Sequence, residues 1–355
     1  IQIGECFPNI ANIMHKSTVL RAVVGCEGRH DSFQCMTGFR HAQMRALGGH
    51  PALGSVLHKL QGPVDASVPP YIGMKTDGVW KNPGTPGFLG PTYAPFIPDG
   101  QGLADMKLTG ITTDRLADRK AVLKSFDRLK TSLDVTGQLE GLDSYQQQAF
   151  DVLTSSKLVD ALDVSKEDQV IRERYGDGKP FQYKYDGADT NNERLLQARR
   201  LVEVGVRCVT LTYGRWDSHG DNEGLVRHHG TRIDQAVAAL VTDLEERGML
   251  DDTLVLVCGE IGRTPKFLNR GNVDGRDHWS YCFPALMTGA GIQQGAIYGE
   301  SDDHAAYPLS DAVAPADIAA TIYDRLGIDP ETRVPGPQGR PVPIAEGGKV
   351  LERLI

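Results

Sequence analysis

The chain lacks the patterns that mark membrane proteins and nucleic-acid-binding proteins. No stretch approaches the roughly 18 consecutive apolar residues of a membrane span. Basic residues are outnumbered, since 38 Lys and Arg stand against 46 Asp and Glu, which gives a net charge of -8 over 355 residues. Proteins that bind nucleic acid usually carry a basic patch or stripe, and this balance argues against one. The sequence therefore predicts neither a membrane span nor a nucleic-acid partner.

Several compact site motifs are absent as well. The six cysteines lie far apart and form no Cys-x-x-Cys pair, which argues against a zinc ribbon or a thioredoxin-type site. No GxGxxG, GxxxxGKS/T or GxSxG stretch stands between a predicted strand and a predicted helix. Nucleotide-binding folds and serine hydrolases therefore lose their main support.

What the sequence does contain is an alternation of strands and helices. Apolar, β-branched runs bounded by glycine or proline predict strands at 17–25, 68–74, 206–214, 252–260 and 282–291. Apolar residues three and four apart predict helices at 50–62, 193–205, 223–248 and 315–327. This alternation is typical of a sheet covered by helices on both faces. We expect a single α/β domain over 1–355, built on a doubly wound, mostly parallel sheet.

One long segment interrupts the alternation. Residues 76–104 are dense in glycine and proline and predict an irregular surface loop. From about residue 113 to 175 the chain is strongly charged and has helical periodicity. We interpret residues from about 100 to 190 as a helical cap inserted between strands of the sheet.

Polar residues gather just beyond two of the predicted strands, and they are Asp217, His219, Glu260, Asp277 and His278. In open α/β sheets, ligands bind beyond the carboxyl ends of the strands. Carboxylates and imidazoles together are the ligands of a divalent transition metal such as Zn²⁺ or Mn²⁺. The sequence therefore predicts that these five residues bind metal.

Three further residues are candidates for catalysis on an anionic substrate. Arg29 and His30 follow the first predicted strand, at a strand-to-helix turn where backbone amides favour anions. Arg263 lies shortly beyond another strand. A guanidinium group binds phosphate or sulfate oxygens in pairs, so we expect Arg263 and Arg29 to hold the substrate. His30 is predicted either to protonate the leaving group or to be a further metal ligand.

Each of these residues also has a purely structural interpretation. Asp217 is compatible with an N-cap, and Glu260 with a helix cap or an ion pair with Arg263. His219 alone is compatible with a surface loop, and His278 with packing against its neighbours. The metal-site hypothesis depends on the joint occurrence of these residues at neighbouring strand ends.

Blocks spread over nearly the whole chain resemble one protein family. They include RHDSFQCMTG, PGFLGPTYAPF, LTYGRWDSH, GEIGRTPK, GRDHW and GAGIQQGAIYGESD, in that order. The sequence is similar to the domain-of-unknown-function family fifteen-oh-one, which is abundant in planctomycetes and often labelled sulfatase-like. That family in turn resembles the alkaline phosphatase superfamily, which includes the sulfatases.

The resemblance implies a doubly wound sheet of the alkaline phosphatase type with one or two metal ions at the strand ends. The implied ions are Zn²⁺ or Mn²⁺, with Ca²⁺ a further option. The residues that match the family's metal-ligand blocks are Asp217, His219, Glu260 and His278. The resemblance also implies a first strand, with a Gly-Gly-Pro block and a metal-binding Asp, that is expected ahead of residue 1. A formylglycine sulfatase is disfavoured, because Cys26 lacks the proline and arginine of the Cys-x-Pro-x-Arg motif.

Together these observations favour a metal-dependent hydrolase of phosphate or sulfate esters. The expected partner is a small anionic ester, with a sulfated or phosphorylated sugar as one candidate. The lack of a recognisable nucleophile leaves an alternative, a secreted, non-catalytic protein that binds a metal or an anion on a degenerate hydrolase scaffold. Members of the resembled family usually carry a twin-arginine export signal, so an extracytoplasmic location, periplasmic or secreted, is expected.

Overall fold

The computed structural model describes residues 1–28, 30, 33–40, 43, 48–74, 84–98, 152, 155–184, 188–267, 273–345 and 347–355. The helices are α1 (Pro8–Ile13), α2 (Phe33–Thr37), α4 (Leu53–Gln61), α8 (Lys157–Leu162), α9 (Gln169–Tyr175), α10 (Glu193–Glu203), α11 (Asn222–Glu246) and α12 (Pro315–Arg325). The strands are β1 (Ser17–Val23), β2 (Tyr71–Met74), β3 (Cys208–Leu211), β4 (Val255–Cys258), β5 (Gly262–Arg263), β6 (His278–Trp279), β7 (Phe283–Thr288), β8 (Ala296–Tyr298), β9 (Glu300–Ser301), β10 (Pro308–Ser310), β11 (Arg333–Pro335) and β12 (Pro341–Pro343).

The largest described sheet has four strands in the order β4-β7-β1-β8. β1 pairs parallel with β8, but β7 runs antiparallel to both β1 and β4. A separate parallel pair joins β2 and β3. The fold is therefore mixed α/β, as the sequence predicts. Its largest sheet is mixed, however, and these pairings do not show the doubly wound, mostly parallel sheet that we expect from the sequence.

The direction of β7 follows from the chain that connects it to β4. Two parallel neighbouring strands need a crossover connection, usually a helix, that returns the chain to the end of the sheet where the first strand began. Between Cys258 and Phe283 the described residues contain the short hairpin of β5 and β6 and no helix. The chain therefore enters β7 at the edge where β4 ends. The lack of helical periodicity in this segment is the sequence signal for an antiparallel neighbour.

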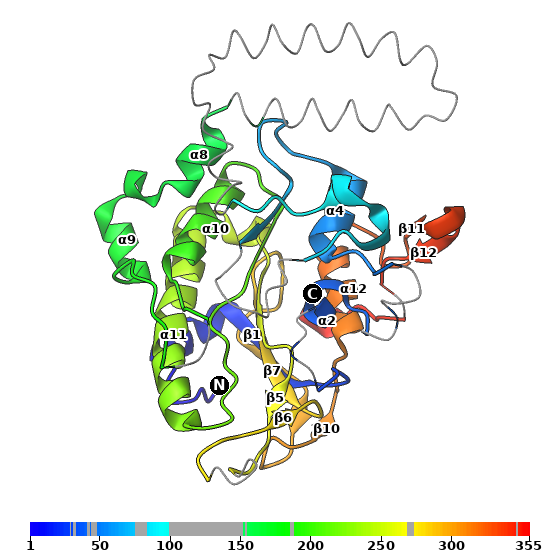
Figure 1. Ribbon diagram of the computed structural model, residues 1–355. Helices are drawn as coiled ribbons and strands as arrows, with labels where there is room; N and C mark the ends of the chain where they lie inside the picture. The colour runs from blue at the N-terminus through cyan, green and yellow to red at the C-terminus, as the bar shows by residue number, and fades with distance from the viewer. Residues whose placement is uncertain are drawn as a thin grey trace, which may run out of the picture.

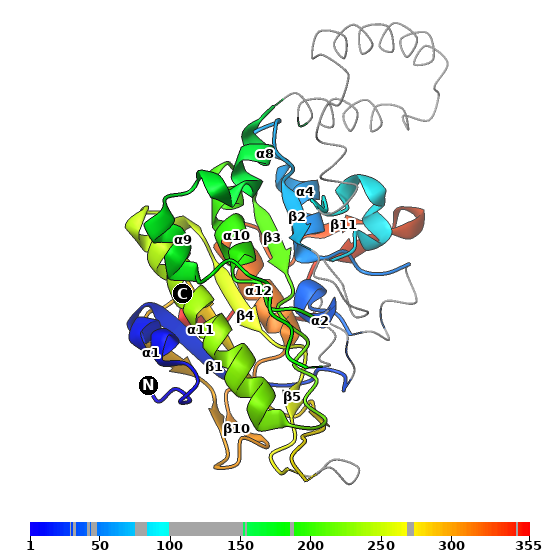
Figure 2. The ribbon, with the colours of Figure 1, turned by 60° about the vertical axis from the view of Figure 1, so that its left-hand side comes forward.

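Helices pack on both faces of the four-stranded sheet. On one face, Val255 and Val257 of β4 contact a cluster built on α10 and α11. On the other face, Leu256 and Cys258 contact a cluster that includes Ile318 of α12. This alternation arises because successive strand residues point to opposite faces. Figures 1 and 2 show α11 and α12 on opposite sides of the sheet.

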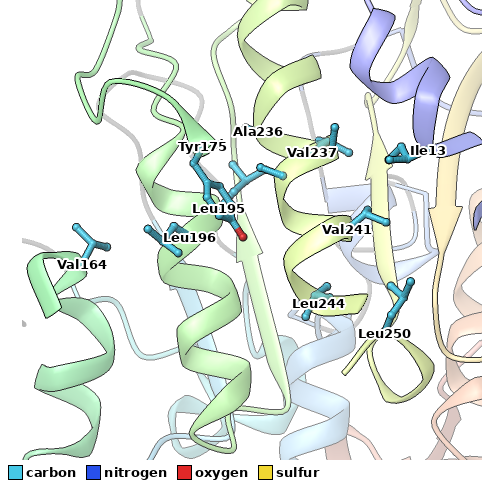
Figure 3. Close-up of a cluster of buried hydrophobic side chains, with 12 residues drawn as sticks. Ile13, Val164, Tyr175, Leu195, Leu196, Ala236, Val237, Val241, Leu244 and Leu250 are labelled. Atoms are coloured by element: carbon cyan, nitrogen blue, oxygen red, sulfur yellow. The ribbon is translucent and has the colours of Figure 1, made fainter. Parts of the chain in front are cut away.

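The core on the α11 side is drawn in Figure 3. Val237, Val241 and Leu244 recur at helical spacing along α11 and are each at most 1% exposed. They share a cluster with Leu195 of α10 and Ile13 of α1. Burying one such side chain contributes about 1.5–3 kcal/mol. This periodic apolar face is the reason why the residues at 223–248 form a helix against the sheet, which confirms the sequence prediction.

A buried ion network connects α10 and α11 to the chain that precedes α9. Arg199 is only 1% exposed. Its Nε donates to Asp243 Oδ2 at 2.8 Å, its Nη1 donates to Glu203 Oε2 at 2.6 Å, and its Nη2 donates to Glu167. Tyr175 adds a hydrogen bond to Asp243 at 3.0 Å. Removing one partner of such a group leaves a buried charge uncompensated, which is strongly unfavourable.

The predicted helical cap lies largely outside the described residues, since 99–151 are not among them. The later part of the predicted insertion is described and contains α8 and α9. Within the part of the chain that the structure describes, no helix combines the length and the apolar character needed to cross a membrane.

We expect Asp243→Ala to lower the free energy of unfolding by about 3–5 kcal/mol, because Arg199 would stay buried without its least exposed partner. Urea denaturation followed by circular dichroism measures the change. The matched control is Asp160→Ala, which removes one member of an exposed ion pair with Lys166 and is expected to cost less than about 1 kcal/mol. Equal costs in the two variants would contradict the importance of the buried network.

Glu167 is expected to make the network sensitive to acid. Burial raises the pKa of Glu167, but Arg199 and Arg200 outweigh that effect and lower it from 4.5 to about 2. Because the folded-state pKa is depressed, this carboxylate stabilises the fold fully above pH 4.5, and the contribution is lost as the pH falls toward 2. The free energy of unfolding should therefore fall more steeply over this range in the wild type than in Glu167→Gln. Urea titrations at several pH values test this, and parallel pH profiles would refute it.

Candidate metal centre

The candidate site lies at one end of the strands of the four-stranded sheet. β1 and β4 terminate at this end, and β7 begins there because it pairs antiparallel with both. His30 lies in the segment after β1, and Asp217 and His219 lie in the loop between β3 and α11. His278 begins β6, shortly before β7. Three segments that are far apart in the sequence therefore meet at one strand edge.

The loop between β3 and α11 is held against the segment that leads into β6. The N–H of Arg276 donates to the carbonyl of Ser218 at 2.9 Å. A Cβ atom on Gly275 would stand 2.1 Å from the carbonyl oxygen of His219. Any side chain at position 275 would therefore push the two segments apart. Glycine is required here because the two backbones approach so closely.

The Nε2 atoms of three histidines surround the carboxylate of Asp217. His219 Nε2 lies 2.9 Å and His278 Nε2 lies 3.4 Å from Oδ1, and His30 Nε2 lies 3.1 Å from Oδ2. Ligand atoms of these four residues all lie within 4.8 Å of one another. Two ligands of a tetrahedral zinc ion stand about 3.4 Å apart, given zinc–ligand distances of about 2.0–2.1 Å. The histidine–carboxylate distances are therefore close to this spacing, the four residues could hold a metal ion, and we call them the metal cluster.

The opposite ring nitrogen of each histidine also faces an oxygen. His30 Nδ1 lies 3.4 Å from Glu260 Oε1. His219 Nδ1 lies 3.6 Å from Asp277 Oδ1. His278 Nδ1 lies 3.1 Å from the backbone carbonyl two residues before His30. Metal-binding histidines commonly donate their second N–H to a carboxylate or a carbonyl, which fixes the tautomer and leaves the other nitrogen for the metal.

Two arginines complete the surroundings of Asp217. Arg263 Nη2 donates to Oδ1 at 2.7 Å, and Arg215 Nη2 donates to Oδ2 at 3.0 Å. The Asp217 side chain is only 7% exposed. Burial raises its pKa, but Arg263, His30 and His219 outweigh that effect and lower it to about 2. Asp217 is therefore ionised at neutral pH, as a metal ligand must be.

The whole chain matches one protein family. The match covers residues 1–355, and the family is described as "Protein of unknown function (DUF1501)". The chain belongs to the DUF1501 family. No curated protein matches it. The family match confirms the resemblance of the sequence blocks, but it does not extend to the alkaline phosphatase or sulfatase superfamily.

The structure brings together only some of the residues predicted for this DUF1501 protein. The four whose ligand atoms converge are His30, Asp217, His219 and His278. Glu260 and Asp277, also predicted as metal ligands, face the Nδ1 atoms of His30 and His219. Arg263 contacts Asp217. Arg29 lies outside the described residues.

Arg215 is a site residue that the sequence does not single out. It stands two positions before Asp217 in the block LTYGRWDSH, and no spacing rule links an arginine at that position to the metal cluster. Its contact with Asp217 arises in a stretch where Trp216 adopts a left-handed backbone conformation, with φ of 60°. Because the left-handed conformation of Trp216 cannot be predicted from its residue type, the contact between Arg215 and Asp217 is visible only in the structure.

Two other titratable groups bear on the chemistry of the DUF1501 site. Burial lowers the pKa of His219, which favours the neutral imidazole that binds metals. Burial, with Cys258 and Glu260 nearby, raises the pKa of Cys26 to about 12. Since the thiolate is the nucleophilic form, Cys26 is a poor nucleophile at neutral pH.

A cavity of about 460 Å³ opens elsewhere, between α9, α10 and α11, and residues that line it include Glu173, Asn192 and Arg232. None of the metal-cluster residues lines it. Arg232 is engaged there by a 3.0 Å hydrogen bond to Thr190 and a 2.7 Å hydrogen bond to the carbonyl of Lys179. We therefore assign the candidate site from convergent ligand atoms rather than from cavity size.

We expect Asp277→Asn and Glu260→Gln each to weaken metal binding about 10–100-fold, the usual effect of removing an outer partner of a ligating histidine. Competition with a chromogenic chelator measures the dissociation constant of Zn²⁺. Asp274→Asn is the matched control, because its side chain is exposed on the same segment, and its affinity should equal that of the wild type. Complete loss of binding in either variant would indicate a direct ligand, and unchanged affinity in both would exclude the outer role.

Proposed function

We propose that this protein is a metal-dependent hydrolase of phosphate or sulfate esters. The observation that carries the proposal is the convergence of three histidine Nε2 atoms and two arginines on the single carboxylate of Asp217. A metal site and guanidinium groups in one place suit a ligand that combines a polarisable ester oxygen with negative charge.

The donor set favours some metals over others. Three imidazoles and one carboxylate are ligands typical of Zn²⁺ or Mn²⁺, whereas Ca²⁺ takes six to eight oxygen ligands. Among the described residues, one group has ligand atoms close enough to hold an ion, which supports one ion rather than two. When bound, such an ion acts as a Lewis acid toward an ester oxygen and lowers the pKa of water.

The residues around the metal cluster would divide the remaining work. Arg263 and Arg215 would turn from Asp217 to the non-bridging oxygens of the substrate once a cation compensates that carboxylate. His30 contacts Oδ2 of Asp217, whereas the other two histidines contact Oδ1. Its two predicted roles exclude each other at Nε2: bound to the ion, His30 would be the third imidazole ligand, whereas unbound it would protonate the leaving oxygen. In either role Glu260 would hold its ring.

The finer fold assignment belongs to the same proposal. We infer an architecture of the alkaline phosphatase type, supported by the resemblance of the sequence blocks and by a site at the ends of β1 and β4. The reaction class is argued from the residues around Asp217, because one scaffold hosts many functions. An extracytoplasmic location is part of the proposal and rests on the resemblance alone.

A second candidate function is non-catalytic binding of a metal or an anion. The observation that favours it is the charge balance at Asp217, where Arg263 and Arg215 already compensate the carboxylate without any cation. The protonated state of the Cys26 thiol is consistent with the same reading, since it removes one potential nucleophile.

Metal analysis of the purified protein is the first test. We expect about one equivalent of zinc or manganese by mass spectrometry, lost in Asp217→Ala and retained in the control Asp274→Ala. Screening with p-nitrophenyl phosphate and p-nitrophenyl sulfate should then show metal-dependent hydrolysis. In Arg263→Gln we expect kcat/KM to fall about 100-fold, the effect of losing one donor to developing negative charge. Absence of metal would refute the proposal. Bound metal without hydrolysis of either ester would favour the second candidate function, non-catalytic binding.

A further inference from the structure

An exposed aromatic group lies directly beside His278 in the sequence. The rings of Trp279, Tyr281 and Tyr307 have centroids 4.8 Å, 5.5 Å and 5.6 Å apart, and we call them the aromatic patch. Tyr281 is 55% exposed and Tyr307 is 49% exposed. Large aromatic side chains stabilise a fold most when they are buried. Aromatic rings that gather at the surface and stay half exposed therefore indicate a binding surface.

The aromatic patch is held in place by backbone structure. Trp279 lies on β6, and its Nε1 donates to the carbonyl of Ala306 at 2.6 Å. Asp302 accepts a hydrogen bond from the N–H of Ala306 at 2.7 Å and donates its own N–H to the carbonyl of Tyr307 at 2.9 Å. The turn between β9 and β10 is thus fastened to β6, and Figure 1 shows β6 and β10 together at one end of the molecule. The rings are arranged before any ligand arrives, which lowers the entropic cost of binding.

The ring geometry limits what the patch can bind. The rings are inclined to one another by 62°, 69° and 49°. An aromatic cage for a quaternary ammonium group needs open space between its rings. Centroids this close leave the rings in direct contact with each other, so a ligand must lie on their outer faces. This geometry excludes a cation cage and suits a ligand with an extended apolar face.

The charge around the aromatic patch further limits the class of ligand that it can bind. Exposed Glu300 and Asp303 lie in the same β9–β10 region as Tyr307. Carboxylates repel phosphate and sulfate groups, but they accept hydrogen bonds from hydroxyls. A sugar ring presents a flat C–H face and a rim of hydroxyls, which matches aromatic rings bordered by carboxylates. The anionic group of an ester would instead lie near the arginines of the metal centre.

The size of the aromatic patch argues against a protein partner. Two half-exposed tyrosines offer roughly 200 Å² of surface, given about 150–250 Å² for a whole aromatic side chain. A stable protein interface buries about 800 Å² on each partner. The patch is therefore small for a protein but adequate for one or two sugar units.

We propose that the aromatic patch binds neutral units of a saccharide chain whose esterified unit enters the metal centre. This inference deepens the proposed function, on which the role of the saccharide as substrate rests. His278 and Trp279 are adjacent on β6, so their side chains point to opposite faces of the strand. The two sites therefore engage different units of one chain, and the ligand is an oligosaccharide or polysaccharide rather than a monosaccharide.

Calorimetric titration of the full chain, freed of metal by a chelator, tests the binding directly. The probes are neutral hexasaccharides of glucose, mannose, galactose and xylose. We expect at least one to bind, and the double variant Tyr281→Ala/Tyr307→Ala to weaken it about tenfold or more, from the combined loss of two ring contacts. The double variant Tyr281→Phe/Tyr307→Phe keeps the ring faces and should keep most of the affinity. Phe267→Ala is the control, because Phe267 is an exposed aromatic outside the patch, 47% exposed.

Three results would overturn the inference: no hexasaccharide binds at millimolar concentration, the double alanine variant binds as well as the wild type, or sedimentation shows self-association that the double alanine variant abolishes. The last result would make the patch a contact between copies of the chain. Because binding is measured without metal, saccharide binding without ester hydrolysis would refute only the proposed function. Hydrolysis of p-nitrophenyl esters without saccharide binding would refute only this inference.

Discussion

The carboxylate of Asp217 is the interaction on which the site depends. Its side chain is only 7% exposed, yet both of its oxygens face nitrogen atoms from separate segments of the chain. A buried carboxylate without such partners would be strongly unfavourable. The loop before α11, the segment after β1 and the β5–β6 hairpin must therefore come together for Asp217 to stay ionised. The same convergence gives three histidines a common point toward which their Nε2 atoms are directed.

The mixed sheet explains why these segments meet. Because β7 runs back from the edge where β4 ends, the residues that precede β7 lie beside those that follow β1 and β4. A crossover helix between β4 and β7 would have placed His278 at the opposite edge. The close approach at Gly275 then brings the loop of His219 against β6. Topology thus supplies the neighbourhood, and one glycine permits the final contact.

Charge is used differently in the two buried polar regions of the protein. Around Arg199 each acidic group is paired with arginines, and the network connects helices in the core. Around Asp217 the partners include histidines, whose second nitrogens face further oxygens. The first arrangement is saturated by side chains alone, whereas the second has the form of a ligand set with its outer partners in place. This contrast distinguishes a structural network from a candidate site.

The sequence by itself determined the local elements, since a continuous apolar run marks β4, a period of 3.6 marks α11, and charged residues follow the strands. It also determined the residue types available to a metal. Only the tertiary structure decided the direction of β7, the contacts of Glu260 and Asp277 with histidine Nδ1 atoms, and the presence of Arg215 at Asp217. The physical reason is the sequence distance over which each interaction acts. Backbone periodicity acts over a few residues, whereas His278 reaches Asp217 across 61 positions of sequence, so that contact depends on how the whole chain packs.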